Sequence, residues 1–231
     1  MNAVKKIVLT RIQKLIGSLM YESKLKKPCC YLSRDVKIKT LNRVRKAYCK
    51  ETKTRVTTND FFIMAIGRSI KRFNLFAGYP DASGSNLEIN PSIGVGLAVA
   101  APHGLVVPVV RDPGDKTLGQ VAAESDGLVK KARARKLMPD DFDGANVVLS
   151  GLGMYGIDSF LAITPPASAG IISIGRFEDE LVIEGDEIQT CRTMSVSLAA
   201  DMRIVNEFYA ARFLADVVEQ LENPERLVEK L

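Results

Sequence analysis

A strand-like run, a polar turn and a helix follow one another near the C-terminus, and this succession constrains the fold most. Residues 194–200 alternate as a strand does, residues 201–207 are polar, and residues 208–221 have helical apolar periodicity. A turn between a strand and a helix holds its side chains on two rigid elements, and catalytic groups often lie on such turns. We therefore take residues 201–207 as the first candidate site.

The rest of the chain alternates between expected helices and expected strands. Helices are expected at residues 7–25, 41–50, 58–73 and 117–136, with Thr40 and Thr117 at the start of two of them. Strands are expected at residues 29–38, 93–100, 105–110, 147–149, 171–175 and 180–184, the second and third forming a buried hairpin. No repeat or linker interrupts this order, so we predict a single α/β domain over residues 1–231, with a mixed, mostly buried central sheet and flanking helices.

Composition excludes a membrane span and a convincing zinc site. The apolar runs are interrupted well before the length that crosses a bilayer. The chain has a single histidine, His103, which lies in a Pro-His-Gly turn, and its four cysteines have no CxxC spacing. We expect reduced thiols and hence the cytoplasm or, in a eukaryote, the mitochondrial matrix. We expect Cys29 and Cys30, which are adjacent on a strand, to be small buried hydrophobes.

Charge is distributed unevenly along the chain. Residues 1–72 carry 19 of the 32 Lys and Arg residues but 4 of the 27 Asp and Glu residues. Such a region can attract polyanions, and a polyanion-binding module is one interpretation. The basic residues are scattered and not interleaved with exposed aromatics, so we favour a solvated face, or halves that complement each other between subunits, over nucleic-acid binding.

Several short stretches, in order along almost the whole chain, resemble one family. They are RIQKLI (residues 11–16), PCCYL (28–32), VTTNDFF (56–62), IGVGLAVA (93–100), GLVVPVVR (104–111), KLMPDDF (136–142), SGLGMYG (150–156), ITPPASA (163–169) and DMRIVN (201–206). The family is the C-terminal catalytic domain of the dihydrolipoamide acyltransferases of 2-oxo acid dehydrogenase complexes, which shares its fold with chloramphenicol acetyltransferase.

The resemblance implies a trimer with active sites in channels between subunits. Coenzyme A enters from one end and a lipoamide arm from the other, and no covalently bound cofactor is implied. In an Asp-His-Arg-x-x-Asp/Asn-Gly motif the histidine removes the thiol proton, because a weakly acidic thiol needs a base. A serine of the neighbouring subunit donates a hydrogen bond to the oxyanion.

Carried over residue by residue, this motif lacks its base. Asp201 and Arg203 match the residues that fix the loop geometry, and Asn206 matches the Asp/Asn position. The histidine position is Met202, whose thioether does not accept a proton at neutral pH. The motif's glycine is Glu207, which adds bulk and charge at the channel.

Ser150 falls on the oxyanion serine, and the turn that follows it falls on the family's coenzyme A side. That side is expected to comprise Ser150, Gly151, Leu152, Gly153, Met154 and Tyr155.

Each retained residue also has a purely structural interpretation. Asn206 is a good helix N-cap with an acidic residue behind it. Ser150 can simply end a strand, Asp201 and Arg203 can be structural ions, and Met202 can plug a former channel.

Two functions remain open. The first is a core or scaffold subunit with impaired catalysis, in a homotrimer or in a mixed trimer with a histidine-bearing paralogue, alongside other subunits of a 2-oxo acid dehydrogenase complex. The alternative is an active acyltransferase that moves an acyl group between dihydrolipoamide and coenzyme A, alone or by lending Ser150 to a partner. We expect no lipoyl or peripheral-subunit-binding domain in this chain, and residues 227–231 as a contact between trimers.

Overall fold

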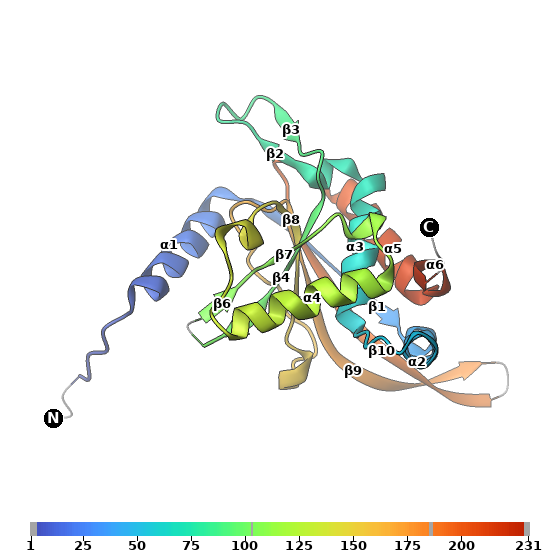
Figure 1. Cartoon of the computed structure of the whole chain (residues 1–231). Helices are drawn as coiled ribbons and strands as arrows, with labels where there is room; N and C mark the ends of the chain where they lie inside the picture. The colour runs from blue at the N-terminus through green and yellow to red at the C-terminus, as the bar shows by residue number, and fades with distance from the viewer. Residues whose placement is uncertain (1–3, 103, 185–186, 229–231) are drawn as a thin grey trace.

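A six-stranded mixed sheet is the centre of the computed structural model, which describes residues 4–102, 104–184 and 187–228 (Figure 1). Its strands lie in the order β1-β10-β9-β8-β4-β7. Neighbours are antiparallel except for the pairs β8–β9 and β4–β8, which are parallel. The strands are β1 (Cys29–Lys37), β4 (Gly94–Leu97), β7 (Val109–Arg111), β8 (Ala145–Gly151), β9 (Gly170–Glu184) and β10 (Glu187–Asp201). The predicted α/β class with a mixed central sheet is confirmed.

Two short ribbons and the helices complete the architecture. The ribbons pair β2 (Gly78–Pro80) with β3 (Leu87–Ile89) and β5 (Val99–Ala101) with β6 (Gly104–Val106). The helices are α1 (Arg11–Lys26), α2 (Lys39–Thr52), α3 (Thr58–Arg72), α4 (Leu118–Arg133), α5 (Glu207–Glu222) and α6 (Glu225–Val228). Short 3-10 turns lie at η1 (Asn74–Ala77), η2 (Pro113–Asp115), η3 (Pro139–Phe142) and η4 (Gly153–Tyr155). In the part of the chain that is described, no helix is long and apolar enough to cross a bilayer.

Helix α3 is the centre of the apolar core. It contacts α4, α5, β4 and β8, and its residues from Asp60 to Gly67 are all buried. Behind it, the Phe76 ring stacks on the Phe213 ring of α5 with a centroid distance of 4.0 Å. Burial of large side chains between helix and sheet is the main favourable term in such a fold. This packing positions both ends of α3 and the start of α5 against the sheet.

Helix α1 differs from the expected amphipathic packing. It begins at Arg11 rather than at residue 7, because Thr10 caps it by accepting a hydrogen bond from the Gln13 backbone N–H. Its apolar face is exposed, with Ile12 at 44% and Leu15 at 58% exposure, and the helix extends away from the sheet (Figure 1). Among the described residues of one chain, Ile16 on that face is half-buried, whereas Ile12 and Leu15 are left exposed.

Three other expected elements need correction. Thr40 lies inside α2 and does not cap it, because the helix already begins at Lys39. The strands expected at 171–175 and 180–184 are one continuous strand, β9, since pairing with β10 continues past the polar residues between them. The hairpin at 93–110 is buried along β4 and at Val99 of β5, while Leu105 on the β5–β6 tip is 56% exposed.

The remaining elements lie where they are expected, except that the strand expected at residues 194–200 begins earlier, as β10 spans Glu187–Asp201. Helix α3 starts at Thr58, and α4 follows the N-cap residue Thr117 and ends in a basic turn. His103 lies outside the described residues, as does the end of the expected C-terminal contact, residues 229–231. Cys30 is buried as expected, but Cys29 is only half-buried.

Candidate functional site

The turn after β10 is organised by one buried carboxylate. Asp201 is fully buried and forms a bidentate pair with Arg203, whose Nε lies 3.0 Å from Oδ1 and whose Nη2 lies 2.7 Å from Oδ2. The Arg203 backbone N–H also donates to Oδ1 at 3.0 Å. These bonds raise the pKa of Arg203 above its ordinary value. They link the Asp201 side chain to both the backbone and the side chain of Arg203, and the role expected for both residues in an active-site loop stays a prediction.

Lys27 is a second cation at Asp201 that the sequence patterns did not single out. Its Nζ lies 3.8 Å from Asp201 Oδ2 and donates to the backbone oxygens of Pro165 at 2.7 Å and Ser168 at 2.6 Å. Burial lowers its pKa to about 8, and the Asp201 charge only partly opposes this shift. Lys27 therefore links the turn to the Pro-Pro segment and has no free lone pair at neutral pH.

Met202 occupies the position expected of a base. Its backbone N–H donates to the Pro28 oxygen at 2.8 Å, so the backbone of the turn is fixed, while its side chain is 41% exposed. A thioether is a weak hydrogen-bond acceptor and cannot take the proton of a thiol. The described part of the chain also contains no group of three or more His, Cys, Asp or Glu residues arranged to hold a metal ion.

Asn206 is the N-cap of α5. Its Oδ1 accepts a hydrogen bond from the Tyr209 backbone N–H at 2.9 Å. Glu207 is the first residue of the helix and exposed, where its charge interacts favourably with the helix dipole. The structural interpretation of Asn206 is confirmed, and the bond to Tyr209 occupies its side-chain oxygen.

Ser150 is half-buried near the end of β8 and far from the turn. It pairs with Ser173 of β9, which in turn pairs with Ser197 of β10. From these rows to the end of β10 is about 13 Å along the strands, and two strand spacings add about 10 Å across the sheet. The fold therefore separates Ser150 from Met202 by roughly 16 Å within one chain.

The turn after Ser150 borders a cavity of about 310 Å³. Of the residues expected on the coenzyme A side, Gly151, Gly153 and Met154 line it, while Ser150, Leu152 and Tyr155 do not. The other walls come from the start of α3, from the end of β4 and the residue after it, and from β9 and β10. Gly153 has no room for a side chain, because a Cβ there would lie 2.3 Å from the Gly175 backbone oxygen.

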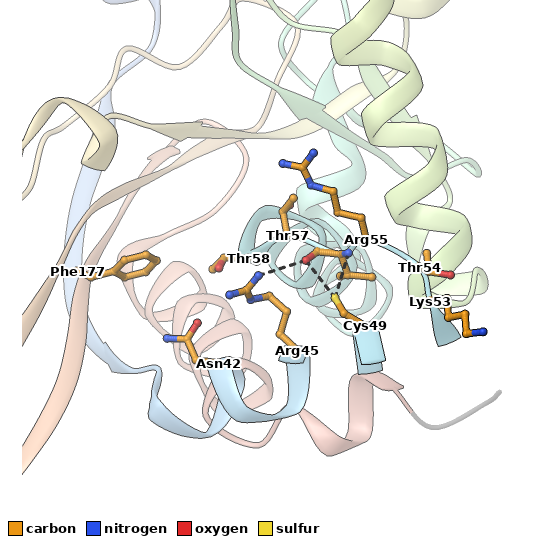
Figure 2. Close-up of a pocket in the computed structure, with 10 residues that line it drawn as sticks. Asn42, Arg45, Cys49, Lys53, Thr54, Arg55, Thr57, Thr58 and Phe177 are labelled. Carbon is orange, nitrogen blue, oxygen red and sulfur yellow. Dashed lines mark hydrogen bonds between the residues drawn. The ribbon is translucent and has the colours of Figure 1, made fainter. Parts of the chain in front are cut away.

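Two more cavities adjoin this one and are rich in cations. A cavity of about 530 Å³ shares Thr58 and Phe177 with the first and is lined by Arg45, Lys53 and Arg55 (Figure 2). A cavity of about 720 Å³ shares Asn59, Leu97 and Met154 with the first. It adds Lys130 and Arg133 of α4 together with the carboxylates of Asp60 and Asp126, and Asp126 is paired with Lys130. The sequence patterns missed this region, although its signal is the density of basic residues from 43 to 55 immediately before the VTTNDFF stretch.

A fourth cavity lies at the turn itself. It has about 880 Å³ and is lined by Arg203, by the β2–β3 ribbon and by Pro166 and Ala167. The hollow beside the turn and the three adjoining hollows, two of which include residues of η4, are thus lined by different parts of the described chain.

A family model, the 2-oxoacid dehydrogenases acyltransferase (catalytic domain), matches residues 1–229. The chain is 32% identical over 218 residues to the dihydrolipoyllysine-residue acetyltransferase component of the pyruvate dehydrogenase complex of Rickettsia bellii, covering 92% of this chain and 51% of that protein. It is 33% identical over 226 residues to the mitochondrial pyruvate dehydrogenase protein X component of Mus musculus, covering 96% of this chain and 44% of that protein. The chain thus spans about half the length of these curated relatives.

Solved structures agree with the sequence relatives. A structure determined to investigate a serine, a histidine and an asparagine in the mechanism of Azotobacter vinelandii dihydrolipoamide acetyltransferase has a TM-score of 0.91 at 26% identity, covering 98% of this chain and 95% of that chain. A chloramphenicol acetyltransferase has a TM-score of 0.52 at 10% identity, covering 88% of this chain and 94% of that chain, which supports the fold alone.

Proposed function

Because the chain belongs to the acyltransferase (catalytic domain) family of the 2-oxoacid dehydrogenases, we propose that it is a core protein of such a complex whose own catalysis is impaired. The observation that carries the proposal is Met202, in a turn whose Asp201–Arg203 geometry is otherwise intact. Loss of a general base typically costs a factor of about 10² to 10⁴ in rate. Its function is then to form part of the structural core of the multienzyme complex.

Lys27 does not replace the missing base. Its pKa of about 8 keeps it protonated at neutral pH, and its ammonium group is hydrogen-bonded to two backbone oxygens beside Asp201. A base must reach the thiol that it deprotonates. Lys27, with a side chain only 5% exposed, is closed off from a ligand.

We propose that coenzyme A binding is retained in the connected cavities beside η4. The 310 Å³ cavity suits the narrow pantetheine arm, and the cations of the two adjoining cavities suit the phosphates. Binding and deprotonation use different residues, so one function can persist when the other is lost.

We also propose a trimer in which Ser150 serves a neighbour. Ser150 and the turn lie roughly 16 Å apart in one chain, as a site shared between subunits requires. The exposed apolar face of α1 is a surface for a second copy. A histidine-bearing paralogue in a mixed trimer would then receive the Ser150 hydroxyl as its oxyanion donor. Similarity to a protein X component supports this arrangement.

The decisive experiment measures acyl transfer from acetyl-coenzyme A to dihydrolipoamide by the purified protein. We expect no turnover above background for the natural chain and a gain of about 10² to 10⁴ for Met202→His combined with Glu207→Gly. Met202→Gln with Glu207→Gly is the matched control, since it opens the channel without supplying a base. Turnover by the natural chain would overturn the impaired-catalysis proposal.

The alternative, an active acyltransferase, is favoured by the intact Asp201–Arg203 pair. It predicts turnover that depends on the chain's own serine, so Ser150→Ala would abolish it. The mixed-trimer proposal predicts instead that Ser150→Ala lowers the activity only of a complex reconstituted with the histidine-bearing partner. Full activity of that reconstituted complex would contradict it.

A further inference from the structure

The far part of the β9–β10 ribbon carries an exposed apolar face. Its apolar side chains are Leu181, Ile183 and Ile188, at 72% to 77% exposure. Ile183 is paired with Ile188 across the ribbon, and Leu181 stands two residues before Ile183, so all three lie on one face. Apolar side chains gathered in one exposed patch mark a contact with another molecule. We call this surface the apolar face of the ribbon.

The same ribbon has a free edge. Strand β8 pairs with β9 only as far as Ile174, and the Arg176 backbone N–H donates to the Ile157 oxygen at 2.8 Å. Across residues 177–183, the part of the chain that is described forms backbone bonds to β9 from the β10 side alone. An unpaired edge with apolar side chains is a ready template for a further strand.

Residues 4–10 have the properties of that strand. They precede α1, belong to no helix or strand and are exposed throughout. Their apolar side chains are 53% to 87% exposed and comprise Val4, Ile7, Val8 and Leu9, of which three are β-branched. Figure 1 shows this arm and the ribbon on opposite sides of the molecule, so the arm of one chain is out of reach of its own ribbon.

Charge selects the arm over a second ribbon. Residues 1–16 contain four Lys and Arg and no Asp or Glu, whereas residues 176–192 contain six Asp and Glu and two Arg. Two ribbons placed edge to edge would bring like charges together, which is unfavourable across strands. The arm of a second copy brings opposite charges together, which favours both the contact and its orientation.

We infer that residues 4–10 of one copy add as a strand to the free edge of β9 in a second copy. The inference rests on the trimer proposed above, whose subunits this contact joins head to tail. Side chains alternate between the two faces of a strand, so Ile7 and Leu9 together contact the apolar face of the ribbon. Lys6 falls on the opposite face, where Glu180 is exposed.

The test reverses the charge on each surface and measures the association of the full chain by sedimentation equilibrium. Lys6→Glu and Glu180→Lys should each weaken association about tenfold, because each brings like charges together. The double variant restores an opposite pair and should associate as the natural chain does. Lys136→Glu and Glu88→Lys are the matched controls and should leave association unchanged, since both side chains are exposed and lie outside the arm and the ribbon.

A short bismaleimide cross-linker locates the contact. Cys191 of β10 is half-buried and pairs with Glu180 of β9, about 10 Å from a strand added outside β9. Lys6→Cys should therefore be linked to Cys191 of a second copy, and Ile7→Cys, on the other face, should lose this link.

Three results would overturn the strand addition: no link from position 6, equal links from positions 6 and 7, or no recovery in the double charge variant. If the natural chain is a trimer all the same, the proposed assembly stands without this contact. A natural chain that stays monomeric overturns both the assembly and the contact.

Discussion

Two Asp–Arg pairs, one in the turn after β10 and one between β9 and β10, have the same geometry in opposite surroundings. In the first, Arg203 binds Asp201 in bidentate fashion, and in the second Arg192 binds Asp179 in the same way, with distances of 2.6 Å. Asp201 is fully buried, whereas both partners of the Asp179–Arg192 pair have about half their side-chain surface in solvent. The two pairs are therefore alike in geometry and differ in burial.

The physical reason is solvation. Water solvates the charges of an exposed pair almost as well when they are apart, so the pair contributes little to stability even with good geometry. Water cannot replace a missing partner in a buried pair, so removal of one partner leaves an uncompensated charge inside the protein. At Asp201 two cations, Arg203 and Lys27, depend on the same carboxylate.

The largest expected effect comes from Asp201→Asn, which keeps the size of the side chain but removes its charge. It leaves Lys27 buried without a counter-charge, and we expect the free energy of unfolding to fall by about 3 to 5 kcal/mol. Urea denaturation measures this change. Asp179→Asn is the matched control and should leave the unfolding midpoint within the scatter of the measurement. Equal shifts of the unfolding midpoint for both variants would contradict the expectation that the buried pair contributes more to stability than the exposed pair.

A somewhat smaller effect is expected from pH acting on Lys27. Its pKa is about 8 in the folded protein and 10.5 as its ordinary value. Between these pH values the unfolded chain binds the proton more strongly, so the stability of the folded state rises with pH. The full difference is about 3 kcal/mol.

Other groups titrate in the same range, so the comparison is with Lys27→Met. The stability of the natural protein relative to this variant should increase from pH 8 to pH 10.5 and be constant below pH 7. Parallel pH profiles for the two proteins would show that Lys27 is not a strained buried cation.

The smallest effect is expected at Asn206, which acts on the turn through the helix cap alone. Asn206→Ala removes the acceptor for the Tyr209 N–H and should cost about 1 kcal/mol. Asn206→Asp, which keeps an acceptor, should cost much less. If the aspartate variant is as unstable as the alanine variant, Asn206 has a further contact in the assembled protein.

Much of the fold and the main turn are predictable because their signals are local. The apolar period predicts α3 and α5, Thr117 and Asn206 mark helix starts, and the motif stretches place Ser150 and Asp201 in a known order. Local signals fail where long-range pairing takes over, as in β9, which continues as one strand because β10 lies beside it.

Local signals also fail where a residue acquires its role from distant partners. Nothing in the sequence around Lys27 distinguishes it from Lys24 or Lys26, yet only Lys27 is buried against Asp201. Ser150 is recognisable from its stretch, but the separation from Met202 follows from the register of three strands.

The sequence by itself determined the family, the order of the elements and the chemistry missing at Met202, because these depend on the identity of side chains at fixed spacings. Which charges are buried and which hollows adjoin one another follow from the tertiary structure alone. Solvation and cavities depend on what packs over a residue, and that information is spread over the whole chain. Thus the Asp201–Arg203 and Asp179–Arg192 pairs share the same bidentate geometry, and only the packing around Asp201 makes that pair structural.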